Sequence, residues 1–335
     1  MDERATSLVV VGASAGGVEA LSRLAAGLPA DLNAAVGVVL HLPAGAESRL
    51  ARILDHAGPL AATQARDGEP LVAGRIYVAP PDRHLLARDG RCRVSRGPHE
   101  NGLRPSIDVL FRSAATAYGR HAVAVVLSGT RDDGVAGASA VGRCGGCVFV
   151  QDPREAFFPG MPLETLSRDH PDRVLPLDEL AQAVASRVEN LSKEDPVSEN
   201  ANDEMSLETD YATLGRNALE RDGPSGTSSV FSCPECGGVL WELEDGETLR
   251  FCCRVGHAYT AEGALDGQGI GVETALWTAL RALRERAQLS ERIARRTGES
   301  GAEHSRKRFE ALAQEARDQA DVIRRVLVGR DGAER

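Results

Sequence analysis

Short apolar runs alternate with amphipathic segments through the first half of the chain. The runs are rich in Val, Ile and Leu, as buried parallel strands are, and they cover residues 7–12, 34–40, 74–80, 121–127 and 147–153. Apolar residues recur every three or four positions in 16–28, 107–117 and 177–191, which predicts helices. This alternation favours an α/β fold with a doubly wound, mainly parallel sheet. Residues 61–100 contain more turn dipeptides, and we expect an antiparallel extension there.

A second helical pattern fills the C-terminal part of the chain. Its apolar positions are Leu276, Leu280, Leu283 and Ala287, then Phe309, Leu312, Ala316, Ala320, Ile323 and Leu327, with a polar, glycine-containing break at 297–301. One apolar stripe on each side of the break predicts a helical hairpin over residues 272–328. The stripes could pack within this chain, receive a partner helix, or form a dimer through the C-terminal helices.

The negative charge is concentrated in one short segment. The chain has 335 residues, enough for about two domains, and a net charge of −10, which disfavours nucleic acid as a partner. Residues 191–230 contribute −6, whereas the residues before and after them contribute −2 each. The expected parts are a catalytic domain at 1–190, an acidic, solvated linker at 191–230 with a helical turn near 211–219, a small unit at 231–262, and the hairpin.

Several features bear on where the chain works and what it cannot bind. No apolar run approaches the roughly 20 residues of a membrane span, and the N-terminus does not have the pattern of a signal peptide. Seven cysteines, several in CxxC pairs, favour a metal site in a reducing cytoplasm over a disulfide framework. Lys193 and Lys307 are the only lysines, which excludes a Walker loop and a Schiff-base lysine from the first domain.

A glycine-rich motif, GASAGG at 12–17, separates the first predicted strand from the first predicted helix. One interpretation is a degenerate dinucleotide-binding loop. Ser14 replaces the middle glycine of GxGxxG, however, and the second strand ends in His41 rather than in a ribose-binding acid. The favoured interpretation is a GxSxG nucleophile elbow, a tight turn that exposes the serine hydroxyl. The following helix N-terminus then points N–H groups at developing negative charge.

Polar side chains also follow two other strands of the predicted sheet. A serine is a weak nucleophile and needs a base. His41 closes the second strand, and strands one and two, if neighbours, lie about 5 Å apart, within reach of the Ser14 hydroxyl. Asp132 and Asp133 follow the strand at 121–127, and such a carboxylate can orient the base. We therefore predict a Ser-His-Asp triad at the carboxyl edge of the sheet.

Each of these residues also has a plain structural interpretation. Ser14 could cap the helix, and His41 could be an ordinary loop histidine. The two aspartates could belong to a turn before Gly134. Their joint placement at three strand ends favours the triad. The order Ser, His, Asp along the chain differs from that of the α/β-hydrolases and disfavours that superfamily.

Four residues in the second half of the chain have the spacing of a metal site. Cys233 and Cys236 form a CxxC pair, and Cys253 and His257 follow as CxxxH. Three thiolates and an imidazole suit tetrahedral zinc, and four protein ligands make such a site structural. Cys252 could replace Cys253, although Cys253 has the better spacing to His257. We expect a small zinc ribbon; buried thiols without a metal and a redox switch are the alternatives.

Six segments of the first domain resemble the catalytic domain of the chemotaxis receptor protein-glutamate methylesterase (CheB) family. They occur in the family's order within residues 7–190 and read VVVGASAGGVEAL, VVLHLP, DGEPLVAGRIYVAPPDRHLL, RPSIDVLFRSAA, VVLSGTRDDGVAG and QDPREAFFPGMPLE. The resemblance implies that the catalytic serine, histidine and aspartate are Ser14, His41 and Asp133. It also implies that Ala15, Thr130 and Met161 belong to the oxyanion or substrate loops.

The resemblance further implies a reaction. Members of the family hydrolyse γ-glutamyl methyl esters on receptor helices, releasing methanol, and some deamidate glutamine. Ser14 would attack, His41 would act as base and then as acid, and Asp133 would hold the histidine tautomer. Backbone N–H groups near Ala15 and Thr130 would bind the oxyanion. No cofactor is implied for catalysis, and the expected partner is a methylated chemoreceptor or a similar helical signalling protein.

The sequence departs from the family pattern in three places. The esterase segments begin almost at residue 1, so we expect the usual N-terminal receiver domain to be absent. The family's LTGMGxDG loop reads LSGTRDDG, which places Arg131 where glycine is typical, and GASTGG reads GASAGG. These changes leave a second hypothesis, that of a catalytically weak signalling or scaffold protein that binds protein partners through its zinc and helix tail.

Overall fold

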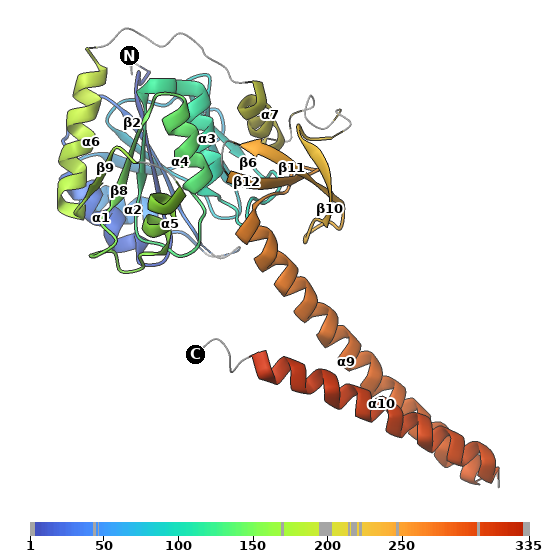
Figure 1. The fold of residues 1–335 in the computed structure, drawn as a ribbon. Helices are drawn as coiled ribbons and strands as arrows, with labels where there is room; N and C mark the ends of the chain where they lie inside the picture. Colours follow the sequence, from blue (N-terminus) through green and yellow to red (C-terminus); the bar gives the residue numbers. More distant parts are fainter. Residues whose placement is uncertain are drawn as a thin grey trace. The chain divides into compact units, whose positions relative to one another are not determined.

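The protein, seen here as a computed structural model, has two compact units, Met1–Ala264 and Leu265–Arg335. The structure describes residues 4–42, 45, 47–168, 171–193, 203–213, 215, 220, 223–245, 248–299 and 302–330. The first unit contains the sheets, and the second is a pair of helices (Figure 1).

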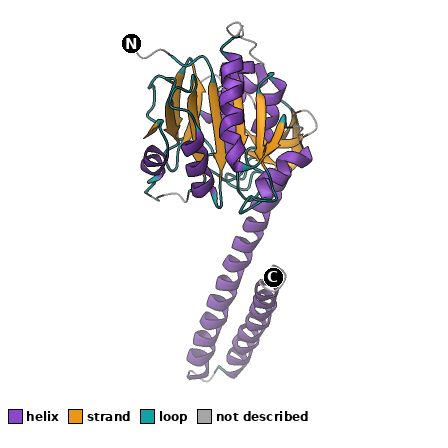
Figure 2. Ribbon diagram, turned by 90° about the vertical axis from the view of Figure 1, so that its left-hand side faces the viewer, coloured by secondary structure: helices purple, strands orange, loops and turns teal. Residues whose placement is uncertain are grey.

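A seven-stranded sheet forms the centre of the first unit (Figure 2). Its strands are β1 (Leu8–Ala13), β2 (Ala35–Leu40), β3 (Ala61–Gln64), β4 (Arg75–Val78), β7 (Ala122–Val126), β8 (Cys147–Gln151) and β9 (Arg173–Leu175). They lie in the order β3-β4-β2-β1-β7-β8-β9, and every neighbouring pair is parallel. The predicted α/β fold with a mainly parallel sheet is confirmed.

Helices cover both faces of this sheet (Figure 1). They are α1 (Gly17–Gly27), α2 (Leu50–Ala57), α3 (Ile107–Tyr118), α4 (Val135–Arg143), α5 (Gly160–Arg168) and α6 (Leu177–Leu191). α1, α2 and α6 share one apolar core with Val9 and Val11, and α3, α4 and α5 share the other with Leu8 and Val10. Because alternate side chains of a strand point to opposite faces, the all-apolar β1 supplies both cores.

The expected antiparallel extension over 61–100 is smaller than predicted. β3 and β4 lie in the parallel sheet, and within the described part of this segment the antiparallel ladder is the hairpin of β5 (His84–Arg88) and β6 (Arg91–Ser95). Asp89 and Gly90 join these two strands with φ angles of 53° and 67°. Positive φ at both central positions is the type I′ turn that an Asp-Gly pair favours.

A second sheet, which we call the ribbon, comprises residues 227–260. Its strands β10 (Thr227–Ser232), β11 (Val239–Asp245), β12 (Thr248–Cys253) and β13 (Ala258–Thr260) pair antiparallel in that order. Leu240, Phe251 and Tyr259 are buried in a small apolar core of its own. The ribbon begins at Thr227, before the expected boundary at 231.

The acidic segment 191–230 differs from the solvated linker that its composition predicts. It contains a ten-residue helix, α7 (Asp203–Ala212), whose residues Tyr211 and Ala212 are buried. Glu208 of this helix forms ion pairs with Arg112 in α3 and Arg250 in β12. Of the helical turn expected near 211–219, residues 211 and 212 belong to α7, and residues 214 and 216–219 lie outside the described residues.

The helical hairpin consists of α9 (Ala261–Glu299), whose first four residues belong to the first unit, and α10 (Glu303–Arg330). It extends beyond the predicted range of 272–328 at both ends. The predicted stripes meet, because Leu280, Ala320 and Leu327 are buried together. Glu291 and Arg317 form an ion pair between the two helices. None of the helices in the described part of the chain has both the length and the apolar character needed to cross a membrane.

Candidate active site and metal cluster

Ser14 lies on a tight turn between β1 and α1. Its N–H donates to the Ser128 carbonyl at 3.0 Å, and its own carbonyl accepts from Gly17 N–H at 2.9 Å. Gly16 has a φ of 71°, and a Cβ there would lie 2.9 Å from Ser128 Oγ and 3.0 Å from Phe157 Cβ. Both the backbone conformation and the crowding require glycine at this position, as the nucleophile-elbow interpretation expects.

His41 directly follows β2, next to Ser14. Ala13 pairs with Leu40 in the sheet, and His41 N–H donates to the Ala13 carbonyl at 3.2 Å, so Ser14 and His41 take the next positions along the two strands. His41 Nε2 lies 2.7 Å from Asp133 Oδ2, and the side chains are 12% and 1% exposed. His41 and Asp133 are thus in direct contact, and Nδ1 is the imidazole nitrogen that remains for the serine.

Ser14 lies next to His41, which contacts Asp133. In the described part of the chain, the Ser14 hydroxyl and the His41 ring do not form a hydrogen bond. In hydrolases without substrate, the bond between nucleophile and base is often long and shortens only when substrate binds.

Asp133 is held at the N-terminus of α3. Its carboxylate accepts hydrogen bonds from Ser106 Oγ at 2.8 Å, Ile107 N–H at 2.7 Å and Asp108 N–H at 3.3 Å. Burial raises the pKa of Asp133, but the hydrogen bonds from His41, Ile107 and Ser106 outweigh it, so the pKa lies below its ordinary value. The carboxylate is therefore ionised at neutral pH and can orient the imidazole.

Asp108 shows the opposite shift in the same buried cluster. Burial and the negative charge of Asp133 raise the pKa of Asp108 well above its ordinary value. Its Oδ1 accepts hydrogen bonds from Gly134 N–H at 3.0 Å and Gly137 N–H at 2.6 Å, at the start of α4. The two buried carboxyl groups therefore have different roles, one charged beside the histidine and one tying α3 to α4.

The predicted oxyanion residues lie beside Ser14, in two loops. Among the described residues, neither the Ala15 nor the Thr130 N–H donates to another main-chain carbonyl. Gly129 approaches Ser14 closely, since a Cβ on Gly129 would lie 2.9 Å from Ser14 Cβ. The same Cβ would lie 2.0 Å from Met161 Sδ, and Met161 is fully buried. Met161 therefore packs against this loop.

Sequence patterns did not indicate Ser106 and Asp108 as members of this site. A usable signal was present for Ser106, because a serine directly before a predicted helix is a typical N-cap, and its Oγ accepts from Val109 N–H at 3.5 Å. That the same hydroxyl donates to Asp133 depends on the packing of α3 against the β7–α4 loop, which local sequence patterns do not report.

The four predicted metal ligands form one cluster in the ribbon. His257 Nδ1 lies 3.7 Å from Cys233 Sγ and 3.5 Å from Cys253 Sγ, and Cys236 Sγ lies 3.7 Å from Cys253 Sγ. All four ligand atoms lie within 4.8 Å of one another. Cys252 points to the other face of β12, where its Sγ is buried with Leu243 and Ala258. The alternation of the strand therefore selects Cys253 over Cys252.

A carboxylate supports the histidine of this cluster. His257 Nε2 lies 3.3 Å from Glu235 Oε2, so the ring presents Nδ1 to the thiols and Nε2 to the carboxylate. His99 Nδ1, from the segment between β6 and α3, lies 2.7 Å from the same oxygen, and Tyr259 OH donates to Glu235 Oε1 at 3.2 Å. Carboxylate partners of this kind fix the orientation of metal-binding histidines.

Comparison with known proteins agrees with this geometry. The CheB methylesterase family model matches residues 9–184. Protein-glutamate methylesterase/protein-glutamine glutaminase 4 of Myxococcus xanthus is 41% identical over 180 residues, which are 53% of this chain and 51% of that protein. Protein-glutamate methylesterase/protein-glutamine glutaminase 5 of Anaeromyxobacter dehalogenans is 44% identical over 174 residues, 51% of this chain and 48% of that protein.

A solved structure covers the same region. The crystal structure of the Thermotoga maritima CheB methylesterase catalytic domain superimposes with a TM-score of 0.52 and 33% identity, covering 54% of this chain and 97% of that one. The chain spans about half the length of the curated relatives that it matches. Together with the sheet order and the position of GASAGG at its carboxyl edge, these matches establish that the chain belongs to the CheB methylesterase family.

Proposed function

We propose that this chain hydrolyses γ-methyl esters of glutamate side chains in proteins, and deamidates glutamine at the same site. The observation that carries the proposal is the 2.7 Å contact between His41 and a buried, ionised Asp133 beside the Ser14 turn. Relatives that share this region are named protein-glutamate methylesterase/protein-glutamine glutaminase. The substrate that fits is a methylated chemoreceptor helix or a similar helical signalling protein.

The proposed reaction has two steps. Ser14 Oγ attacks the ester carbonyl while His41 Nδ1 accepts the serine proton, and Asp133 stabilises the imidazolium through Nε2. The tetrahedral intermediate expels methanol, which takes the proton from His41, and leaves a glutamyl-serine ester. Water then attacks this ester with His41 as base, which releases the glutamate carboxylate and restores Ser14.

The N–H groups of Ala15 and Thr130 are the proposed oxyanion donors. They belong to the two loops that flank Ser14, and α1 begins at Gly17, directly after the elbow. Donors and a helix N-terminus that are fixed before the reaction stabilise negative charge as it develops. Each such donor contributes about 3–4 kcal/mol of transition-state stabilisation in well-studied hydrolases.

The rim of the site is apolar, which suits a protein substrate. Phe157 is 79% exposed and Phe158 is 36% exposed. Gly129 N–H donates to the Phe158 carbonyl at 2.9 Å, and Phe158 N–H donates to Ser128 Oγ at 2.9 Å, so this segment is tied to the loop that carries Thr130. Exposed aromatic side chains beside a nucleophile can contact apolar residues that flank the scissile ester.

We also propose a structural zinc ion held by Cys233, Cys236, Cys253 and His257. In tetrahedral zinc sites two sulfur ligands lie about 3.8 Å apart, and a sulfur and a nitrogen ligand lie about 3.5 Å apart. Three pairs of ligand atoms in this cluster lie 3.5–3.7 Å apart, and all four atoms lie within 4.8 Å of one another, which supports this metal. With all four positions filled by protein, the metal stabilises the ribbon and takes no part in ester hydrolysis.

Replacement of the nucleophile tests the proposed reaction. Ser14→Ala is expected to lower methanol release from methylated chemoreceptor by several orders of magnitude, while the circular dichroism spectrum stays unchanged. Ser22→Ala is the matched control, because Ser22 lies on the exposed side of α1 and donates to the Val18 carbonyl of its own helix. Methanol release by Ser14→Ala at the rate of the unmodified chain would show that another residue is the nucleophile.

A further inference from the structure

The ribbon joins the esterase domain through main-chain and side-chain hydrogen bonds. Asn101 N–H donates to the Ala258 carbonyl at 2.8 Å, and Ala258 N–H donates to the His99 carbonyl at 3.3 Å. Thr260 N–H donates to the side-chain oxygen of Asn101 at 2.8 Å. β13 is thereby attached to the segment that precedes α3, within the same compact unit. The position of Asn101 is thus determined jointly by the esterase domain and the ribbon.

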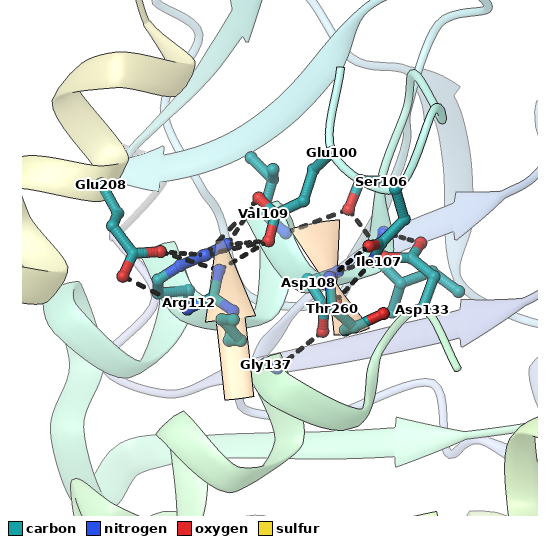
Figure 3. Close-up of polar contacts among 12 residues, drawn as sticks. Glu100, Ser106, Ile107, Asp108, Val109, Arg112, Asp133, Gly137, Glu208 and Thr260 are labelled. Atoms are coloured by element: carbon teal, nitrogen blue, oxygen red, sulfur yellow. Dashed lines mark hydrogen bonds and ion pairs between the residues drawn. The ribbon is translucent and has the colours of Figure 1, made fainter. Parts of the chain in front are cut away.

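A buried charge cluster lies beside this junction (Figure 3). Arg250 of β12 is 1% exposed, and its guanidinium lies 2.9 Å from both Glu100 and Glu208. Arg112 of α3 lies 2.6 Å from each of the same two carboxylates. A buried charge that loses its partner is strongly unfavourable. Arg250 therefore resists separation of the ribbon from Glu100, the residue directly before Asn101.

A chain of contacts leads from Asn101 to Asp133. The Asn101 side-chain N–H donates to Asp108 Oδ2 at 3.4 Å. Asp108 N–H donates to Asp133 Oδ1 at 3.3 Å (Figure 3). Asp108 Oδ1 accepts hydrogen bonds from the N–H groups of Gly134 and Gly137, which follow Asp133 in the chain. Asp108 therefore contacts Asp133 directly and also fixes the chain that follows it.

We infer that Asn101, held in place by the ribbon, is a positioning residue for Asp133. The inference rests on the proposed function, in which Asp133 orients His41. Asn101 has a φ of 54°, a left-handed conformation that asparagine tolerates better than most residues, and its amide bridges Thr260 and Asp108. The ribbon, which lies outside the family-matched region 9–184, thereby affects the geometry of the triad.

Gly263 offers a way to displace Asn101 without changing the esterase domain. A Cβ on Gly263, in the first turn of α9, would lie 2.5 Å from the Asn101 side-chain oxygen and 3.2 Å from Thr260 Oγ1. The added methyl group must therefore push the Asn101 amide away from its two partners. Gly269 lies in the same helix, and a Cβ there would meet no atom within 4 Å, so Gly269→Ala is the matched control.

The test measures two rates on the full-length chain. For Gly263→Ala we expect kcat for methanol release to fall about 10- to 100-fold with KM unchanged, because a misplacement near 1 Å has costs of this order. The rate at which a fluorophosphonate labels Ser14, forming the phosphorus–oxygen bond and expelling fluoride, should fall by the same factor. Gly269→Ala should match the unmodified chain in both rates. A Gly263→Ala chain with unmodified rates would overturn the inference.

A double-substitution cycle separates this effect from general destabilisation. Asn101→Gly tolerates the positive φ and removes the bridging amide, so it should lower both rates as Gly263→Ala does. Adding Gly263→Ala to Asn101→Gly should lower them no further, because the methyl group then has no amide to displace. Additive losses, or an Asn101→Gly chain with unmodified rates, would contradict a positioning role even if Gly263→Ala fails to fold.

The labelling rate distinguishes this inference from the proposed function. If the unmodified chain is labelled on Ser14 but releases no methanol from methylated chemoreceptor, the substrate assignment fails while the inference stands on the labelling rates. If the unmodified chain is not labelled on Ser14, the triad itself fails, and the inference with it.

Discussion

Arg131 shows how one residue can differ from its family pattern at a cost. Its φ is 67°, a left-handed conformation that costs a residue with a side chain about 1–2 kcal/mol and glycine almost nothing. The family's glycine at this position is therefore explained by the backbone of the loop. The Arg131 side chain is exposed, next to Thr130 and the proposed oxyanion site.

Replacement of Arg131 by glycine is accordingly expected to relieve this strain. The free energy of unfolding of Arg131→Gly in urea should exceed that of Arg131→Ala by about 1 kcal/mol, since the left-handed strain outweighs the greater chain entropy of glycine. Arg131→Ala is the control, because it removes the same guanidinium and keeps the strain. Equal stability of the two variants would indicate that the backbone conformation is not the cause.

His84 predicts a dependence of stability on pH. The ring is fully buried, its Nε2 donates to the Pro98 carbonyl at 2.8 Å, and its Nδ1 accepts from Ser106 N–H at 3.3 Å. Burial lowers the pKa of His84 from 6.5 to about 4. The folded protein therefore keeps the ring neutral between these two pH values, whereas the unfolded chain binds a proton there, so stability falls as the pH falls.

Between about pH 6.5 and about pH 5, the free energy of unfolding is expected to fall by roughly 2 kcal/mol, at about 1.4 kcal/mol for each pH unit. Urea unfolding at the two pH values measures it. His84→Gln, which keeps a donor and an acceptor but does not titrate, should lose about 2 kcal/mol less over the same range. If both chains lose stability equally, other groups are responsible for the pH dependence.

At the scale of elements, β12 explains why two adjacent cysteines behave differently. Cys253 faces the cluster with Cys233, Cys236 and His257, whereas Cys252 is buried on the opposite face with Leu243 and Ala258. Because successive strand residues alternate between faces, only one of the pair can be a ligand.

Metal analysis of two serine variants tests this assignment. Cys233→Ser should lose most of the one zinc per chain that we expect, whereas Cys252→Ser should retain it in full. Retention by Cys233→Ser, or loss by Cys252→Ser, would contradict the ligand set. The two substitutions change the same atom and differ only in which face of the ribbon they affect.

Some elements could be predicted from local pattern, and others could not. The apolar runs at 7–12 and 121–127 became β1 and β7 because burial on both faces leaves a continuous apolar signal. α7 gave no comparable signal, since its contacts depend on Glu208, whose partners Arg112 and Arg250 are distant in sequence. Attraction between remote charges has no local periodicity.

At the scale of the whole molecule, topology made the candidate triad accessible to sequence reasoning. Ser14, His41 and Asp133 each follow a strand, and β2, β1 and β7 are neighbours in the sheet. A rule about the carboxyl ends of parallel strands was therefore sufficient to group them. Asn101 does not follow a strand of the main sheet. Its proposed role depends on its contacts with Ala258 and Thr260 of the ribbon, which could not be predicted from the pattern of the first domain.

The acidic segment also contributes ion pairs to the first compact unit. Its net charge suggested a solvated connection, yet Glu208 and Asp210 pair with Arg112, Arg250 and Arg88 of the same compact unit. Burial raises the pKa of Glu208, but the two arginines outweigh it and bring the pKa down to about 2. Glu208, from the acidic segment, therefore supplies negative charge next to the buried guanidinium groups of Arg112 and Arg250.

The junction between β13 and residues 99–101 has a practical consequence for anyone who divides this chain. The match to the CheB methylesterase family model ends at residue 184, whereas the compact unit continues to Ala264. A fragment cut at the first boundary would expose Glu100 and Arg112 without Arg250 and would free the Asn101 side chain from Thr260. The family match and the compact unit therefore end at different residues, and a transfer of this domain into another protein should keep the chain up to Ala264.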